Sequence, residues 1–270
     1  FSEPGAGSDL ANVSTKAERD GDEWILNGQK VWSSGAQFSP WGMAVCRTDN
    51  ELAKHKGITV FIVPMDAPGL EVRQIQQMSG GTSFNEVFFT DVRVPDAYRV
   101  GDIGEGWKVA LTVLGFERGS SNGSSRVGGN WAQAKGLAQH LGVTSDPVVR
   151  DDLARLYSQY RIMALNNQRV AAQTKAGQAP GPEGSISKMI WVKSMNLMSD
   201  VVTKLLGPRI TADTGEWGTY DWNEHLLGAP GYRIAGGSDE IQRNIVGERV
   251  LGLPGEPRVD KNVPFKDIPK

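Results

Sequence analysis

The spacing of apolar residues changes near Gly104, and this change constrains the fold more than any other feature. Before Gly104, short apolar runs are separated by Gly, Pro and Asp, a pattern typical of strands and turns. After it, apolar residues recur at helical intervals. A run of strands followed by a run of helices predicts an α+β chain or two separate domains, divided as residues 1–101 and 102–270.

Several short segments of the first part are predicted as strands that form a small β-barrel or sandwich. The pair Asn27-Gly28 predicts a two-residue hairpin turn between two of them. The predicted strands are Trp24–Leu26, Lys30–Trp32, Trp41–Arg47, Gly57–Pro64, Leu70–Arg73 and Asn85–Pro95.

The second part is predicted to be helical, with Asp146 capping one of the long helices at Pro147. Residues 207–232, rich in Gly, Trp and Pro, are predicted as a long ordered loop with little helix. The predicted helices are Trp107–Arg118, beginning close to Gly106, Val127–Leu141, Pro147–Gln173, Gly184–Leu206 and Ser238–Leu251, the last capped by Ser238.

Composition excludes several classes of function. The 270 residues carry a net charge of −2, which gives no electrostatic footprint for nucleic acid. Cys46 is the only cysteine, so no internal disulfide can form, and no Cys/His spacing indicates a metal site. No apolar run reaches the roughly 20 residues of a membrane-spanning helix. We expect a cytoplasmic or otherwise reducing setting and, since the chain begins without Met, a truncated chain or partial gene product.

Glu117 lies deep in an apolar run, among Leu114 and Phe116. A carboxylate there is either paired or held for proton chemistry, because burying an unpaired charge is costly. The pairing alternative is a surface contact with Arg118, although neighbours on a helix point apart.

Three Gly- and Ser-rich stretches are candidate ligand loops, and each also has a purely structural interpretation. The segment Glu3–Asp9, which includes Ser8, is either a surface turn or a loop whose N–H groups approach a ligand. Trp32, Ser33 and Ser34 are either a strand end or a flat wall with hydroxyl donors for a planar heterocycle. The stretch that begins at Gly236 is either a loop with an N-cap or an anion-binding helix start.

Taken together, these stretches resemble the acyl-CoA dehydrogenase family, whose order they follow along essentially the whole chain. The matching segments are Glu3-Pro-Gly-Ala-Gly-Ser-Asp9, Asn27-Gly-Gln-Lys-Val-Trp-Ser-Ser-Gly35, Phe88-Phe-Thr-Asp-Val-Arg-Val-Pro95 and Gly236-Gly-Ser-Asp-Glu-Ile-Gln-Arg-Asn-Ile-Val-Gly-Glu-Arg-Val-Leu-Gly252. The resemblance implies a middle β-domain that binds flavin and acyl-CoA, and a C-terminal antiparallel four-helix-bundle domain. The family's N-terminal helical domain has no counterpart in this sequence.

The resemblance also implies FAD-dependent α,β-dehydrogenation of an acyl-CoA thioester, with an electron-transfer flavoprotein as the usual electron acceptor. The residues implied to bind FAD are Ser2, Ser8, Trp32, Ser33, Ser34, Ser238 and Glu240. Those implied on the substrate side are Ser8, near the CoA phosphates, and Arg118.

This chain departs from the family at its catalytic base. Many members carry a catalytic Glu where this chain has Gly236, which cannot accept a proton. A minority place the base before an Arg on the first C-terminal helix, and Glu117 with Arg118 matches that arrangement. Glu117 is therefore the predicted base, and the main-chain N–H of Gly236 the predicted donor to the thioester oxygen.

The second departure concerns the ADP half of FAD. The family's Arg-x-x-Phe-Gly and Gly-Gly-x-Gly segments, which reach a neighbouring subunit's cofactor, correspond to Lys135–Gly142 and Leu206–Ile210, and the first lacks both Arg and Phe. We therefore expect a dimer or tetramer, either homo-oligomeric or mixed with a homologous subunit, as in relatives that act on bulky or steroid-derived acyl chains. A non-catalytic partner subunit and an acyl-CoA oxidase remain alternatives.

Overall fold

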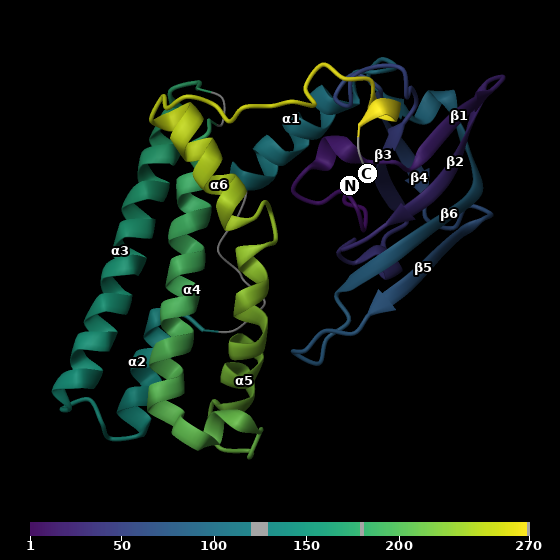
Figure 1. Cartoon of the computed structure of the whole chain (residues 1–270). Coiled ribbons are helices and arrows are strands. Elements are labelled where there is room, and N and C mark those ends of the chain that lie inside the picture. Colours follow the sequence, from purple (N-terminus) through teal and green to yellow (C-terminus); the bar gives the residue numbers. More distant parts are fainter. Residues whose placement is uncertain (120–128, 179–180, 269–270) are drawn as a thin grey trace. The chain divides into compact units, whose positions relative to one another are not determined.

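The computed structural model describes residues 1–119, 129–178 and 181–268, and the chain divides into two compact units (Figure 1). The sheet unit comprises Phe1–Gln77, Gly81–Leu114 and Glu256–Lys270, and the helical unit comprises Met78–Gly80 and Gly115–Gly255. The predicted change from strands to helices is confirmed, because helix α1 (Gly106–Gly119) begins just after Gly104.

The described part of the sheet unit contains one mixed sheet of seven strands in the order β5-β6-β2-β1-β3-β4-β7 (Figure 1). Neighbouring strands are antiparallel except β1 and β3, which are parallel. A β-rich first part is confirmed, and closure into a barrel or sandwich stays a prediction. The strands are β1 (Lys16–Asp20), β2 (Glu23–Lys30), β3 (Trp41–Arg47), β4 (Ile58–Pro64), β5 (Leu70–Ile75), β6 (Phe84–Pro95) and β7 (Arg99–Val100).

Strand β4 is apolar except for Thr59, and both of its faces are buried. Phe61 packs on one side against Trp24, with ring centroids 5.2 Å apart. Ile58 lies on the other side in a cluster with Ala110 of α1. Gly106 is required at the start of α1, since a Cβ atom there would lie 2.7 Å from the carbonyl oxygen of Ile58.

The predicted hairpin at Asn27-Gly28 is wrong, because β2 runs through both residues and the turn lies at Gly21, between β1 and β2. Gly28 instead marks a shift of register against β6. A Cβ atom on Gly28 would lie 2.6–2.9 Å from Thr15. The glycine is therefore needed for close backbone approach at a bulge rather than for a turn.

The described part of the helical unit contains five α-helices, and four of them, α2 to α5, share one apolar cluster that includes Leu137, Leu156, Met198 and Trp222. Asp146 caps α3 as predicted, accepting from the N–H groups at the start of that helix. The long helices α3 and α4 run side by side (Figure 1). The helices are α2 (Trp131–His140), α3 (Pro147–Lys175), α4 (Gly184–Leu206), α5 (Thr219–Gly228) and α6 (Asp239–Ile245).

The prediction of little helix in residues 207–232 is wrong, because this stretch contains α5 between two 3₁₀ turns. Trp222 is 3% exposed and His225 is fully buried on one face of α5. Burial of that face outweighs the weak helix propensity of the surrounding glycines and prolines. The predicted last helix is shorter than expected, since α6 ends at Ile245 and continues as a π turn to Val250.

Candidate active site

Trp32 lies just beyond the end of β2 in a backbone conformation that bulky residues rarely adopt. Its φ angle is +62° and its side chain is 59% exposed, with the ring edge-on to Phe84. The backbone N–H and C=O of the next residue, Ser33, pair with those of Asn85, which holds the strained residue in place. An exposed indole fixed in this way can serve as one wall of a binding site.

The amides around Trp32 alternate between paired and unpaired. The N–H groups of Val31, Ser33 and Gly35 donate to backbone carbonyls, the first of them to Ser2. Within the described residues, the N–H groups of Trp32 and Ser34 have no hydrogen-bond partner. Two donors beside an exposed aromatic ring suit a planar ligand with carbonyl oxygens on its edge.

A buried ion pair joins Glu3 to Lys30, the last residue of β2, two residues before Trp32. The ammonium of Lys30 donates to the Glu3 carboxylate at 2.7 Å and to the carbonyls of Phe1 and Val45, and the side chains of the pair are 4% and 5% exposed. Burial alone would raise the pKa of Glu3, but the charge of Lys30 and several hydrogen bonds outweigh it and lower the pKa. Sequence reasoning missed this pair, although a Lys and a Glu inside the matching motifs were its visible signal.

Ser8 lies on an exposed turn of the sheet unit, next to Asp9. It follows a tighter turn that is closed by paired backbone bonds between Glu3 and Ala6. Asp9 is fixed by Lys54, whose ammonium lies 2.8 Å from its carboxylate. The sheet unit therefore contains Ser2, Ser8 and residues 32–34, and the Val31–Ser2 bond and the buried ion pair join the start of the chain to the end of β2.

Three predicted residues of the helical unit, Gly236, Ser238 and Glu240, lie at the start of α6. Gly236 and Gly237 have φ angles of +63° and +89°, and the N–H of Gly236 has no hydrogen-bond partner in the part of the chain that the structure describes. Ser238 is buried and its hydroxyl accepts from the N–H of Ile241, which confirms the predicted N-cap. Glu240 is exposed on the surface of α6.

Two residues that the sequence did not single out hold the Gly236 turn. The side chain of Gln242 is fully buried and donates to the carbonyl of Gly236 at 2.8 Å. Asp239 forms ion pairs with Lys188 at 3.2 Å and with Arg233 at 3.1 Å, and the pKa of Asp239 is lowered because these partners outweigh its burial. Of these contacts, only the one between Lys188 and Asp239 joins segments that are far apart in the chain, and no spacing in the sequence indicates it.

Glu117 and Arg118 belong to the last turn of α1, but their side chains lie outside the described residues. The prediction that Glu117 is the base therefore stays a prediction. Gly115, two residues earlier in the same helix, lies in open space, since a Cβ atom added there would have no heavy atom within 4 Å.

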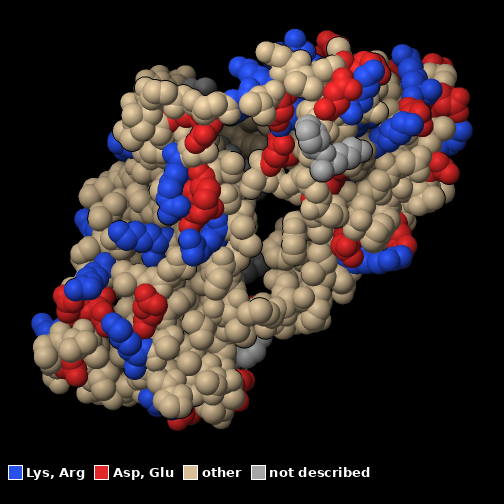
Figure 2. Space-filling view, in the orientation of Figure 1, with Lys and Arg blue, Asp and Glu red and all other residues tan. Residues whose placement is uncertain are grey.

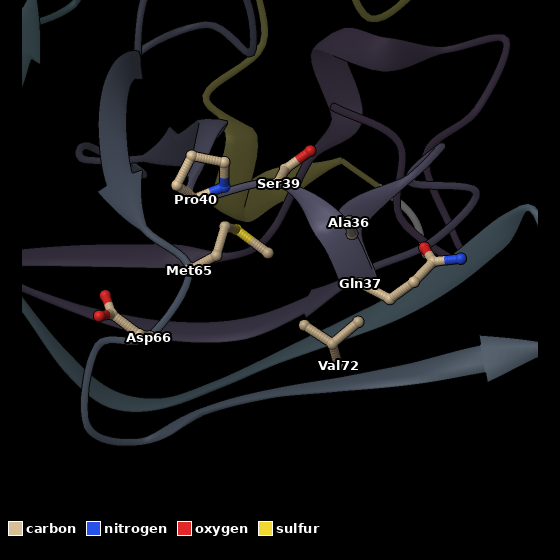
Figure 3. Close-up of a pocket in the computed structure, with 7 residues that line it drawn as sticks. All are labelled: Ala36, Gln37, Ser39, Pro40, Met65, Asp66 and Val72. Carbon is tan, nitrogen blue, oxygen red and sulfur yellow. The ribbon is translucent and has the colours of Figure 1, made fainter.

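A shallow hollow of about 400 Å³ lies in the sheet unit, beside the turn that follows Ser34 (Figure 3). None of the predicted site residues lines it, and it is open to solvent. Its lining residues are Ala36, Gln37, Ser39, Pro40, Met65, Asp66 and Val72.

Other site classes find no support in the described part of the chain. No group of His, Cys, Asp and Glu side chains there is arranged to hold a metal ion. Basic and acidic side chains are interspersed on the face shown in Figure 2. Among the residues that are described, no helix combines the length and apolar character needed to cross a membrane.

Family models match both parts of the chain. The model of the acyl-CoA dehydrogenase middle domain matches residues 1–92, and that of the acyl-CoA dehydrogenase C-terminal domain matches residues 104–251. The chain is 40% identical over 262 residues to acyl-CoA dehydrogenase IpdE1 of Mycobacterium tuberculosis (strain ATCC 25618 / H37Rv), covering 95% of this chain and 66% of that protein. It is 38% identical over 257 residues to acyl-CoA dehydrogenase FadE34 of the same organism, covering 94% of this chain and 35% of that protein.

Solved structures also match almost the whole of this chain. The Tcur3481-Tcur3483 steroid ACAD matches with a TM-score of 0.86 and 32% identity, covering 95% of this chain and 67% of that chain. The ChsE4-ChsE5 complex from Mycobacterium tuberculosis matches with a TM-score of 0.79 and 30% identity, covering 95% of this chain and 68% of that chain. The chain thus spans about two thirds of the length of IpdE1 and of these structures. Because the two family models together match most of its residues, the chain belongs to the acyl-CoA dehydrogenase family.

Proposed function

We propose that this chain is a flavin-binding subunit of an enzyme that removes hydrogen from the α and β carbons of an acyl-CoA thioester, with Glu117 as the base. The acyl group is bulky or steroid-derived, and the assembly contains a second, homologous subunit. Electrons pass to an electron-transfer flavoprotein in the cytoplasm.

The observation that carries the proposal is the segment from Trp32 to Ser34. FAD has a planar ring system with carbonyl oxygens along one edge, which fits an exposed indole beside two unpaired backbone donors. Trp32 would lie against the ring, and Ser33, Ser34 and Ser2 would position it. When bound, this cofactor supplies the hydride acceptor that no side chain can provide.

Proton removal requires an acceptor that Gly236 cannot supply. Glu117 fills this role in the proposal, and general-base assistance of this kind contributes about 10²–10⁴-fold to a rate. The N–H of Gly236, which has no partner among the described residues, would donate to the thioester oxygen as negative charge develops there. Ser238 and Glu240 follow in the same loop and helix and would contact the cofactor.

Replacing Glu117 by Gln tests the base. We expect reduction of bound flavin by an acyl-CoA panel that includes steroid side-chain thioesters to slow by about 10²–10⁴-fold, with flavin content unchanged. The matched control is Glu105→Gln, because Glu105 is an exposed acid directly before α1. Equal rates in the Glu117→Gln variant and wild type would eliminate Glu117 as the base.

The substrate class and the mixed assembly draw support from the names of the similar structures, one a steroid ACAD and one a complex of two proteins. Expressing the chain alone and with a homologous partner tests this part. We expect full flavin occupancy only in the mixed assembly, since Lys135 stands where the family's phosphate-binding Arg is expected. Full occupancy in a homo-oligomer would contradict it.

A second candidate function is a non-catalytic partner subunit, favoured specifically by the absence of a carboxylate at Gly236. In that case the assembly that carries Glu117→Gln would keep wild-type activity. An assembly in which the catalytic base of the partner subunit is replaced would lose activity. An acyl-CoA oxidase, the remaining alternative, would consume oxygen with acyl-CoA when no electron-transfer protein is added.

A further inference from the structure

The C-terminal segment 258–268 packs on the sheet unit, although it follows the helical unit in sequence. The backbone N–H groups of Phe265 and Lys266 donate to the carbonyls of Leu52 and Asn50 at 2.9 and 3.1 Å. The tail therefore pairs with the 50–56 loop much as a short strand would, and this pairing fixes where its side chains lie.

Phe265 covers a buried guanidinium. Arg47 is 2% exposed, and its charged group lies 3.8 Å from the centre of the Phe265 ring. The same guanidinium donates to the carbonyls of Ala11, Val13 and Lys54. Arg47 thus ties the tail, the 50–56 loop and the segment that follows Asp9 into one cluster.

Lys54 links the tail to the Ser8 turn by charge. Its ammonium contacts two carboxylates, one from Asp9 at 2.8 Å and one from Asp260 of the tail. The Lys54 side chain is 8% exposed, so each carboxylate helps to compensate its lost hydration. Burial would lower the pKa of Lys54, but the hydrogen bonds and charges of the two Asp residues raise it, so the ammonium stays charged at neutral pH.

We infer that Lys54 is a positioning residue for the Ser8–Asp9 turn, and that Asp260 of the C-terminal tail holds Lys54 in place for binding the CoA part of the substrate. The inference rests on the proposed function for its ligand, since Ser8 is assigned to the phosphate side of the acyl-CoA site. Ser8 is exposed and directly precedes Asp9, which Lys54 contacts. Without the Asp260 carboxylate, the Lys54 ammonium keeps only Asp9 as an acidic partner, so Lys54 is less firmly held and the turn loses its link to the tail.

The test compares Asp260→Asn with Glu51→Gln in the full chain, in the assembly that binds flavin. Both changes replace a carboxylate by its amide and break one lysine contact of the tail region. Glu51 pairs with Lys266 in an exposed ion pair, with side chains 69% and 49% exposed, so it contributes little. Asp260→Glu, which keeps the charge, is the conservative variant that should restore wild-type behaviour.

Two measurements distinguish whether Asp260 constrains the Ser8–Asp9 turn from whether that constraint matters for binding CoA. We expect Asp260→Asn to speed hydrogen exchange of the amides in residues 5–13 and to raise the dissociation constant for CoA and the KM for acyl-CoA by about tenfold, with kcat unchanged. Glu51→Gln should leave the hydrogen exchange, the dissociation constant for CoA and the KM for acyl-CoA unchanged. Unchanged exchange in Asp260→Asn would refute the contact between tail and turn as a constraint.

Faster exchange with unaltered CoA affinity and KM would refute the assignment to substrate binding. If the wild-type assembly binds neither CoA nor acyl-CoA, the proposed function fails together with this assignment. The exchange measurement still decides separately whether Asp260 constrains the turn, so the two failures are distinguishable.

Discussion

Replacing Glu3 by Gln exchanges one oxygen for an NH₂ group but breaks the buried ion pair with Lys30, at the end of β2. Each oxygen of the Glu3 carboxylate only accepts hydrogen bonds, from Lys30 and the backbone of Thr15 on one side and from Ser14 on the other. An amide NH₂ group must therefore face a donor in either orientation. The substitution leaves the Lys30 ammonium buried without its counter-ion.

Breaking a buried pair of this kind costs about 3–5 kcal/mol. The pair qualifies because both side chains are almost fully buried, at 4% and 5% exposure. Domain stabilities are about 5–15 kcal/mol, so the variant should fold but be marginal. With a urea slope of about 2 kcal/mol/M, the unfolding midpoint should fall by about 2 M.

Urea unfolding followed by circular dichroism and by fluorescence measures this shift. The control is Glu18→Gln, which breaks the Lys16–Glu18 pair, whose side chains are 53% and 58% exposed, and should cost at most about 1 kcal/mol. A double variant with Lys30→Met removes both charges and should cost less than the two single changes added together. Equal midpoints for Glu3→Gln and Glu18→Gln would refute the reasoning.

The pH dependence gives an independent check. The pKa of Glu3 is lowered in the folded chain, so its contribution to stability is present above the unfolded pKa of about 4.3 and is lost as the pH falls through the folded pKa. The difference in unfolding free energy between wild type and Glu3→Gln should therefore be constant near pH 7 and shrink below about pH 4.

Three further predictions concern packing and reactivity. Gly106→Ala should destabilise the sheet unit by about 1–3 kcal/mol, because its Cβ atom would lie 2.7 Å from backbone. Gly115→Ala in the same helix should stabilise the chain by about 0.5–1 kcal/mol, because its Cβ atom would lie in open space and Ala favours the helix. Thermal unfolding measures both changes. Gly237→Ala should lower the melting temperature, since φ is +89° and a Cβ atom would lie 2.6 Å from the Gln242 amide; an unchanged temperature would contradict the geometry. Cys46 should resist thiol reagents at pH 8 until the chain unfolds, because burial raises its pKa to about 11.

Periodicity predicted the regular elements well. The Pro147 start of α3 and both ends of α4 (Gly184–Leu206) agree with the structure, because capping residues and breakers are local signals. The strands β3 to β6 were also predicted, since alternating or continuous apolar runs bounded by turns report burial directly.

The errors arose where a local signal had a second explanation. Asn27-Gly28 is a strong turn pattern, but Gly28 is needed because the backbone of Thr15 passes too close for a side chain. Helix α5 was missed because burial of Trp222 stabilises it against its composition. Both outcomes depend on contacts between residues that are distant in sequence, which single-sequence patterns do not contain.

The sequence by itself determined the family, the division into strands and helices, and the residue types available at the candidate site, including Gly236 in place of a carboxylate. Only the tertiary structure decided that Trp32 is exposed at a positive φ, that Lys30 and Glu3 form a buried ion pair, and that Asp260 contacts Lys54. The physical reason is that periodicity and turn chemistry act over a few residues. Burial, ion pairing and close backbone approach depend on which distant segments the fold brings into contact.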